Sequence, residues 1–173
     1  MMSSEVPNVR LRAMEPEDLD FLYNMENDRE VWQVGVTNVP YSRFLLHEYM
    51  SSASGDIFTD KQLRLMIDVD GQCVGICDLV NFSPRHQRAE VGIVVKKNCR
   101  RHGYATEALH QLTNYALHVL NLHQIYAVVA CANNDAVRLF RRCGFSQETP
   151  LRGWIIDGKQ ASDALLMQFF SHN

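Results

Sequence analysis

Short stretches in which apolar and polar residues alternate recur along the chain, and this period of two is typical of β-strands. Asp70-Gly71 and Asp157-Gly158 each stand between two such stretches, and Asp-Gly pairs favour the tight turn of a hairpin. Strands are therefore predicted over residues 9–14, 62–69, 73–80, 88–95 and 124–131, and in the two arms of a final hairpin, 153–170.

Between the strands, apolar residues recur every three or four positions, as they do along one side of a helix. Four helices are predicted: residues 15–27; a segment after Ser42 with Leu45, Leu46, Tyr49 and Met50 on its apolar side; a segment with Ala105, Ala108, Leu109, Leu112, Ala116 and Leu120 on one face; and residues 135–143. Ser42 can cap the second helix, Asn133 or Asn134 can cap the fourth, and Gly144 ends it. No linker, repeat or low-complexity segment interrupts this order, which predicts one mixed α/β domain.

The composition is that of an ordinary globular domain, with 173 residues, 46% hydrophobic and 21% charged. A net charge of -3 argues against a general nucleic-acid binder, which is usually basic. No signal peptide is evident, and no stretch approaches the ~20 apolar residues of a membrane span. Five cysteines without paired spacing suit a reducing compartment. We expect a cytoplasmic protein that binds neither nucleic acid nor membrane and holds no metal.

The stretch NCRRHGYATEAL, residues 98–109, joins a predicted strand to the third helix. A helix N-terminus offers unpaired N–H groups and about half a positive charge, which suit a phosphate. Gly103 would let a ligand approach the backbone without a Cβ in the way. Arg100, Arg101 and His102 add positive potential. The two common phosphate-binding motifs, G-x-x-x-x-G-K-[ST] and G-x-G-x-x-G, are absent. The stretch therefore predicts another kind of binding site for the diphosphate of a nucleotide-like cofactor. The alternative is an ordinary basic loop that contains a glycine and binds no ligand.

Four segments occur in the order and at the spacing of the GCN5-related N-acetyltransferase (GNAT) superfamily: QRAEVGIVV, RRHGYATEAL, YALHVLNLHQIYAVV and NNDAVRLFRRCGF. RRHGYA resembles the superfamily motif [QR]-x-x-G-x-[GA]. The chain is similar to bacterial spermidine/spermine N-acetyltransferases and to ribosomal-protein N-acetyltransferases. The resemblance implies a single GNAT domain over residues 1–173. Its α/β fold would have a mixed, mostly antiparallel sheet of about six or seven strands flanked by about four helices.

The resemblance also implies that acetyl-CoA is the co-substrate. Backbone groups of Ile93, Val94 and Val95 would pair with its pantetheine arm, and one N–H there would polarise the acetyl carbonyl. The diphosphate would lie against the backbone amides of Arg100, Arg101, His102, Gly103, Tyr104, Ala105 and Thr106. Asn133 matches an asparagine that contacts the cofactor in relatives. The alternative, given equal weight, is that Asn133 only caps the following helix.

Acetyl transfer to an amine requires that the amine lose a proton. An amine with a pKa of ~10.4 is mostly protonated at pH 7, and reaching its neutral form costs about 4.6 kcal/mol. The resemblance matches Glu90 with a carboxylate that faces the amine in many relatives, which would make Glu90 the catalytic base. The alternative is an outward-facing charge on a strand.

The sequence departs from the superfamily at the general acid. Relatives commonly carry a tyrosine where this chain has Phe140, and a phenyl ring cannot donate a proton. Cys143, Tyr104 and Tyr126 are alternative donors, and for each a packing role is the competing interpretation. An acid is useful rather than obligatory, because a thiol of pKa ~8.5 departs as thiolate at a cost of only about 2 kcal/mol at pH 7.

The acceptor is the least determined part of the reaction. Polyamine-acetylating relatives place acidic side chains where this chain has Asn38 and Asn81, and Glu26, Asp28 and Glu30 could supply negative charge instead. We expect direct transfer, in a ternary complex, to a primary amine of a small molecule or peptide, with a polyamine such as spermidine as one candidate. The alternatives are a protein N-terminus, as in the ribosomal type, and a catalytically silent acyl-CoA-binding module. The sequence does not determine whether the chain forms a homo-oligomer.

Overall fold

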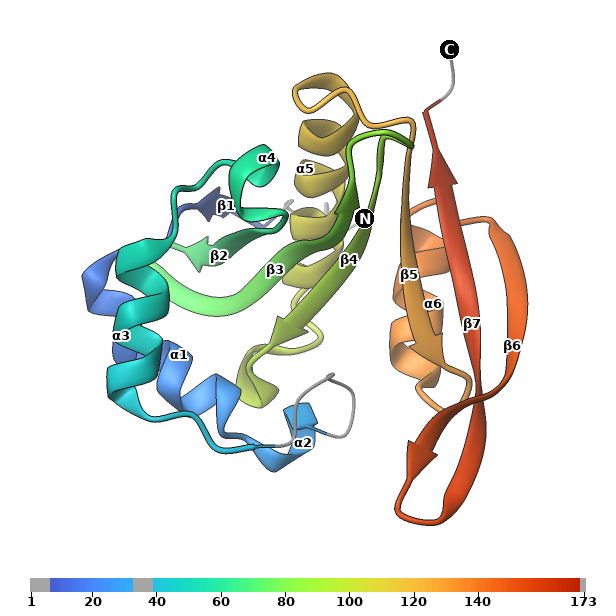
Figure 1. Ribbon diagram of the computed structural model, residues 1–173, viewed down its shortest axis with the longest axis horizontal. Coiled ribbons are helices and arrows are strands. Elements are labelled where there is room, and N and C mark those ends of the chain that lie inside the picture. The colour runs from blue at the N-terminus through green and yellow to red at the C-terminus, as the bar shows by residue number, and fades with distance from the viewer. Residues whose placement is uncertain (1–6, 33–38, 172–173) are drawn as a thin grey trace, which may run out of the picture.

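A seven-stranded sheet forms the centre of the computed structural model, which describes residues 7–32 and 39–171 (Figure 1). The strands are β1 (Val9–Arg12), β2 (Leu63–Val69), β3 (Gln72–Ser83), β4 (Arg88–Val95), β5 (Gln124–Ala130), β6 (Gln147–Asp157) and β7 (Gln160–Phe170). They lie in the order β1-β2-β3-β4-β5-β7-β6, and each pair of neighbours is antiparallel except β4 with β5. This mixed, mostly antiparallel sheet confirms the predicted fold class.

Helices pack against both faces of the sheet (Figure 1). They are α1 (Leu19–Glu26), α2 (Arg29–Trp32), α3 (Arg43–Ser52), α4 (Ile57–Asp60), α5 (Tyr104–His118) and α6 (Asn134–Arg142), with short 3-10 helices η1 (Pro16–Asp18) and η2 (Lys97–Cys99). The longer four, α1, α3, α5 and α6, are the predicted ones. The sequence pattern does not reveal α2 and α4, because a single turn is too short to show a helical period. Within residues 7–32 and 39–171, no helix has the length and apolar character needed to cross a bilayer.

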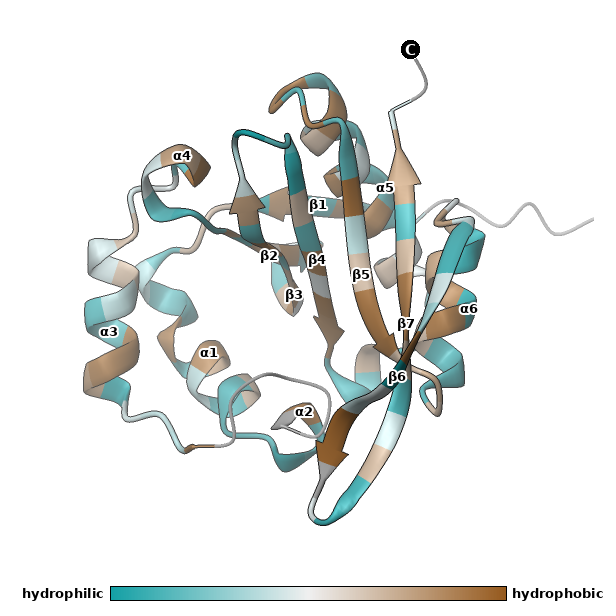
Figure 2. Ribbon diagram, turned by 45° about the vertical axis from the view of Figure 1, so that its right-hand side comes forward, coloured by the Kyte–Doolittle hydropathy of each residue, from teal (hydrophilic) through white to brown (hydrophobic). Residues whose placement is uncertain are grey.

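Alternate residues of the strands supply two hydrophobic clusters, one on each face of the sheet. The larger cluster lies under α5 and α6 and includes Leu109, Leu112 and Phe140. The smaller lies under α1 and α3 and includes Leu22 and Leu46. β4 begins with hydrophilic residues and becomes hydrophobic toward its end (Figure 2). The α5–α6 face is therefore the main core, and the α1–α3 face carries less apolar packing.

Hydrogen bonds at the helix ends confirm the predicted caps. Ser42 Oγ accepts a backbone N–H of α3 at 3.1 Å, and Asn133 Oδ1 accepts one of α6 at 3.2 Å. Asn133 rather than Asn134 is therefore the N-cap of α6. Gly144 follows that helix with φ of 90°, and a Cβ there would lie 2.8 Å from the Phe169 ring. Both the conformation and the close contact call for glycine at this position.

The last hairpin is longer than predicted. β6 begins at Gln147 instead of near Gly153, and it pairs with β7 from that residue onward. Pro150 lies within β6 and cannot donate a hydrogen bond to a neighbouring strand. The sheet tolerates Pro150 because β6 is its edge strand. The sequence pattern therefore misses the first part of β6, where a proline argues against a strand.

Candidate active site

β4 and β5 diverge after a short stretch of parallel pairing. Among the described residues, this pairing is confined to three residue pairs, of which Glu90 with Tyr126 is the last. β4 nevertheless continues to Val95, and β5 to Ala130. The two strands lie side by side at one end and apart at the other (Figure 1). The sheet therefore opens between β4 and β5.

The opening exposes one backbone edge of β4. The N–H of Lys96 donates to the carbonyl of Val74 on β3 at 2.9 Å. Because backbone groups alternate in direction along a strand, Val94 also directs its N–H and C=O toward β3. Ile93 and Val95 direct theirs toward the opening. Of the three residues expected to hold a pantetheine arm, Ile93 therefore offers its N–H and C=O there. Val95 offers only its N–H, because its carbonyl accepts a hydrogen bond from Arg100 Nε.

The loop between β4 and α5 presents bare backbone. The N–H groups of residues 101–106 have no backbone acceptor within the part of the chain that the structure describes. Gly103, the N-cap of α5, has φ of 82°, and Arg101 has φ of 66°. Left-handed residues beside right-handed ones turn successive N–H groups toward a common side, which forms a concavity for anions. A Cβ at Gly103 would make an ordinary 3.6 Å contact with Pro7, so the backbone conformation rather than packing favours glycine.

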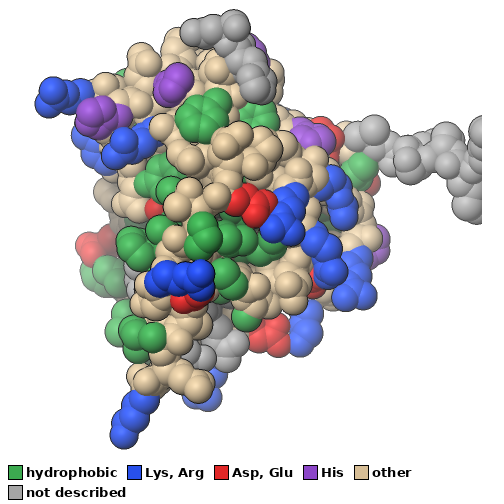
Figure 3. Space-filling view, turned by 90° about the vertical axis from the view of Figure 1, so that its right-hand side faces the viewer, with side chains coloured by type: hydrophobic (Ala, Val, Ile, Leu, Met, Phe, Trp, Pro, Cys, Tyr) green, Lys and Arg blue, Asp and Glu red, His purple; other side chains and the backbone are tan. Residues whose placement is uncertain are grey.

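Basic side chains surround this loop. Arg100 Nε donates to the carbonyl of Val95 at 3.0 Å, which fastens the loop to the end of β4. Asp135, in the first turn of α6, pairs with Arg138 at 2.6 Å. That hydrogen bond is the main reason why the pKa of Asp135 is lowered, and the charges of Arg101 and Arg100 contribute less. The N-terminus of α6 therefore lies near the loop. Figure 3 looks onto the side of the molecule that holds α6, β6 and β7; it shows one group of Lys and Arg side chains on the right and others scattered over the same face.

These features fit the diphosphate of acetyl-CoA. Free amides at a helix N-terminus and neighbouring guanidinium groups are what a doubly charged anion requires. Asn133 serves as the cap of α6, and a contact between Asn133 and a cofactor stays a prediction.

A cleft of about 1230 Å³ opens on the α1–α3 face of the sheet. Its walls come mainly from α3 and the end of α1, its floor comes from β2, β3 and β4, and Val128 of β5 also reaches it. Four of its lining residues are carboxylates: Glu26, Glu48, Asp78 and Glu90. Because Glu90 stands where β4 and β5 part, the cleft and the opening meet at this residue.

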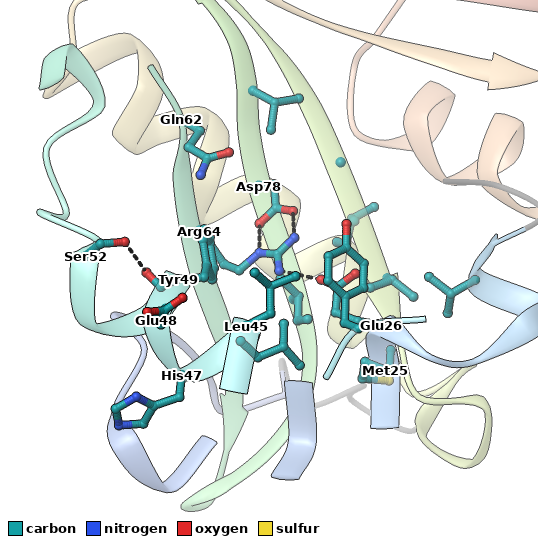
Figure 4. A pocket seen from close by; sticks show the side chains of 18 of the residues that line it. Met25, Glu26, Leu45, His47, Glu48, Tyr49, Ser52, Gln62, Arg64 and Asp78 are labelled. Carbon is teal, nitrogen blue, oxygen red and sulfur yellow. Dashed lines mark hydrogen bonds and ion pairs between the residues drawn. The ribbon is translucent and has the colours of Figure 1, made fainter. Parts of the chain in front are cut away.

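Arg64 lies at the centre of the cleft floor (Figure 4). Its guanidinium donates to both carboxylate oxygens of Asp78, at 2.9 and 2.8 Å, and to Glu26 at 2.5 Å. Burial alone would lower the pKa of Arg64, but the charges and hydrogen bonds of the two carboxylates raise it above its usual value. The guanidinium therefore stays charged, and this cluster ties β2, β3 and α1 together beneath the cleft.

Glu90 is half-buried and has neighbours on both adjacent strands. Asn81 Nδ2, on β3, donates to Glu90 Oε2 at 2.8 Å. Tyr126, on β5, lies opposite Glu90 in the parallel register. Burial, and to a smaller extent the charge of Glu90, raises the pKa of Tyr126. Glu90 thus lines the cleft with one carboxylate oxygen held by an amide, which suits a base for a group bound in the cleft.

Phe140 lies in the α5–α6 core, with 4% of its surface exposed. Phe140 and Glu90 therefore belong to opposite faces of the sheet. Of the alternative proton donors, Cys143 is buried, and burial raises its pKa to about 11. Tyr104 packs against the same core as Phe140. Neither these residues nor Tyr126 are among the described residues that line the cleft, so none of the three expected donors lies there.

Of the acidic residues expected near the acceptor, Glu26 lines the cleft. Asp28 instead accepts the backbone N–H of Glu30, and Glu30 pairs with Lys97 at 2.7 Å. Asn38 lies outside the described residues. Sequence reasoning missed the Arg64 cluster and the hydrogen bond from Asn81, because both depend on which residues face one another across strands.

Comparison with known proteins assigns the family. A family model described as "Acetyltransferase (GNAT) domain" matches residues 8–146. The chain belongs to the GNAT acetyltransferase family. The spermidine N(1)-acetyltransferase of Escherichia coli strain K12 is 30% identical to this GNAT enzyme over 165 residues, which cover 95% of this chain and 87% of the relative. The putative ribosomal N-acetyltransferase YdaF of Bacillus subtilis strain 168 is 29% identical over 90 residues, which cover 51% of this chain and 49% of that protein.

Solved structures share the fold of this GNAT enzyme. The spermidine N-acetyltransferase of Vibrio cholerae in complex with CoA and spermine matches it with a TM-score of 0.83 and 26% identity, covering 94% of this chain and 95% of the other. A dodecameric structure of that enzyme in an intermediate state matches with a TM-score of 0.78 and 27% identity, covering 94% and 93% of the two chains. GNAT enzymes use acetyl-CoA, which is therefore the co-substrate of this one. The predicted family, enzyme class and co-substrate are confirmed.

Proposed function

We propose that this GNAT enzyme acetylates a primary amine bound in the cleft, by direct transfer from acetyl-CoA within a ternary complex. The observation that carries the proposal is the position of Glu90, which lines the cleft at the point where β4 and β5 diverge. The opening in the sheet suits the co-substrate, and the cleft suits the acceptor. Both can then reach one carboxylate, and the transfer needs no covalent intermediate on the enzyme.

Acetyl-CoA, when bound, supplies an acetyl group activated as a thioester. We assign the pantetheine arm to the backbone groups of Ile93 and Val95 and the diphosphate to the free amides of residues 101–106. Arg100 and Arg101 add positive charge at that end. A backbone N–H of β4 in the opening polarises the carbonyl, as oxyanion-stabilising donors do in acyl transfer.

Glu90 acts in this proposal as the base that takes the proton of the acceptor ammonium, directly or through water. Supplying the neutral amine without help costs about 4.6 kcal/mol at pH 7 for an amine of pKa ~10.4. A positioned base typically contributes 10²- to 10⁴-fold in rate. The thiolate needs less help, since its departure costs only about 2 kcal/mol at pH 7. A phenyl ring at position 140 is therefore compatible with turnover.

The proposed acceptor is cationic, and a polyamine such as spermidine is the first candidate. Carboxylates outnumber basic groups in the described cleft lining, with Glu26, Glu48, Asp78 and Glu90 against Arg64 and His47. Relatives named spermidine N(1)-acetyltransferase and a related enzyme bound to spermine support this choice. The dodecameric relative likewise supports assembly of this chain into a homo-oligomer.

Steady-state turnover with four acceptors tests the proposal: spermidine, spermine, butylamine and a peptide with a free N-terminus. We expect higher kcat/KM for the two polyamines than for butylamine, because the cleft carries an excess of negative charge. A preference for the peptide would instead indicate protein N-terminal acetylation, which the similarity to the putative ribosomal enzyme favours. Acetyl-CoA binding in calorimetry without turnover of any amine would contradict catalysis and leave an acyl-CoA-binding module.

A further inference from the structure

An irregularity of β3 determines the position of Asn81. Val80 pairs with Glu90, and the next pair joins Ser83 with Arg88, so β3 has two residues where β4 has one. Such a β-bulge redirects the side chains around it, and bulges are frequent beside active sites. Asn81 has φ of 48°, in the left-handed region that asparagine enters more readily than most residues.

The bulge changes the side of the sheet that these residues face. Leu79 is in the core and Val80 lines the cleft, so in a regular strand Asn81 would return to the core. Instead Phe82 takes the core position. Asn81 stays on the cleft side, where its amide nitrogen lies 2.8 Å from Glu90 Oε2. Val80 therefore lines the cleft, and Asn81, the next residue of β3, reaches Glu90 from the same side of the sheet.

We infer that Asn81 is a positioning residue for Glu90: its amide holds Oε2, so that Oε1 stays directed to the acceptor. This inference rests on the role of Glu90 proposed above. An amide suits the task because it donates to a carboxylate without adding charge beside it. A second carboxylate at position 81 would repel the first and raise the pH at which both are ionised.

Among the described residues, the charged or titratable groups on the strands around Glu90 are Asp78 on β3, Arg88 on β4 and Tyr126 on β5. The other charged or titratable residues that line the same cleft are Glu26, Tyr41, His47, Glu48, Tyr49 and Arg64. Asp78 is already bound by Arg64 through two hydrogen bonds. Among the described residues, Asn81 is the side chain whose amide donates to Glu90. Changing Asn81 therefore alters the hydrogen bonding of Glu90 without removing an ion pair.

Two variants separate positioning from folding, because both tolerate the left-handed conformation of position 81. Asn81→Asp has the same shape and replaces the donor with a carboxylate, whereas Asn81→Gly removes the side chain. The measurement is the pH dependence of kcat/KM for the best amine of the acceptor panel, with acetyl-CoA affinity determined by calorimetry as the control.

We expect Asn81→Asp to move the midpoint of the acidic limb upward by about one pH unit, since like charges about 4 Å apart near a surface interact by 1–4 kcal/mol. Asn81→Gly should lower kcat roughly fivefold, as expected for the loss of one hydrogen bond worth about 1 kcal/mol. Acetyl-CoA affinity should stay within twofold of wild type in both variants.

Glu90→Gln, measured alongside, distinguishes the two ways in which the idea can fail. Wild-type pH profiles in both Asn81 variants, together with a large loss in Glu90→Gln, would overturn the role of Asn81 and leave the proposed function intact. Wild-type turnover in Glu90→Gln would overturn the role of Glu90, and the inference about Asn81 with it.

Discussion

The loop proposed to bind the co-substrate and the cleft proposed to bind the acceptor present different parts of the chain. The loop offers backbone: N–H groups of residues 101–106 that have no backbone acceptor in the described part of the chain, and left-handed conformations at Arg101 and Gly103. The cleft floor offers side chains that bind one another, as Arg64 does with Asp78.

Because of this difference, the two regions should tolerate different substitutions. Backbone amides are the same whatever side chain they carry, so the loop should accept substitutions that keep its conformation. A side-chain cluster depends on every partner, so the cleft should respond to single changes. Acceptor preference can therefore change while acetyl-CoA binding stays the same, and the variants below test this contrast.

The largest effect is expected from Gly103→Asp, which places a carboxylate beside the proposed diphosphate site. At an effective dielectric constant of 20, two unit charges 4 Å apart repel by about 4 kcal/mol, which corresponds to a roughly thousandfold weaker affinity for acetyl-CoA. Calorimetry measures this affinity. Gly71→Asp is the matched control, because Gly71 has φ of 81° against 82° for Gly103 and no atom within 4 Å of its Cβ position. Unchanged affinity in Gly103→Asp would contradict the loop assignment.

Arg64→Gln should lower the free energy of unfolding by about 3 kcal/mol, because it leaves two half-buried carboxylates without a counter-charge. Arg152→Gln is the control, since Arg152 pairs with Asp163 at the surface. The Arg64 side chain is 19% exposed and that of Arg152 is 83% exposed. Loss of the exposed pair should cost under about 1 kcal/mol. Urea denaturation measures the free energy of unfolding of both variants. Equal losses would show that the Arg64 cluster stabilises the fold no more than an exposed ion pair does.

Glu90→Gln should lower kcat by roughly 10²-fold through the loss of proton transfer, with nearly unchanged affinity for acetyl-CoA. The measurement is kcat across the pH range, which in the wild type should rise as the base becomes ionised. Glu148→Gln serves as the control, because Glu148 pairs with Arg141 and is not among the residues that line the cleft. A folded Glu90→Gln variant with a wild-type pH–rate profile would identify Glu90 as a surface charge.

The smallest effect is expected from Arg101→Asn, which keeps a residue that tolerates the left-handed conformation and removes the charge. The affinity for acetyl-CoA should fall less than about fivefold, since exposed charges contribute under about 1 kcal/mol and are screened by salt. Calorimetry at low and high ionic strength checks both points. A loss as large as that of Gly103→Asp would mean that side chains rather than backbone hold the diphosphate.

The sequence predicts the fold well wherever the signal is local. The strand 88–95 has the predicted bounds, and Ser42 and Asn133 cap the predicted helices. Each of these features depends on a few neighbouring residues, such as an alternating pattern or a side chain able to accept a backbone N–H. The loop before α5 is likewise indicated by neighbouring residues, because Gly103 stands between basic residues and the start of an amphipathic helix.

The cleft could not be predicted in this way, because β-bulges set its pairings. An uninterrupted hairpin turning at Asp70-Gly71 would place Arg64 opposite Cys77. A register shift after Ile67 instead brings Arg64 opposite Asp78, and the ion pair on the cleft floor results. A second bulge likewise brings an amide to Glu90. The apolar alternation within a strand does not say which residues pair across strands, yet a one-residue shift decides which polar side chains meet.

The opening between β4 and β5 also bears on how the enzyme behaves in solution without its co-substrate. Beyond Glu90 and Tyr126, the two strands have no further pairing with each other among the described residues, and their edges face each other across the opening. Unpaired edges are templates on which other chains can add strands, and this pairing is the first step of many kinds of aggregation. A co-substrate lying along β4 would occupy that template as a strand does. If acetyl-CoA binds as proposed, it is a protective agent as well as a reactant, and we expect the free enzyme to be the form most exposed to self-association.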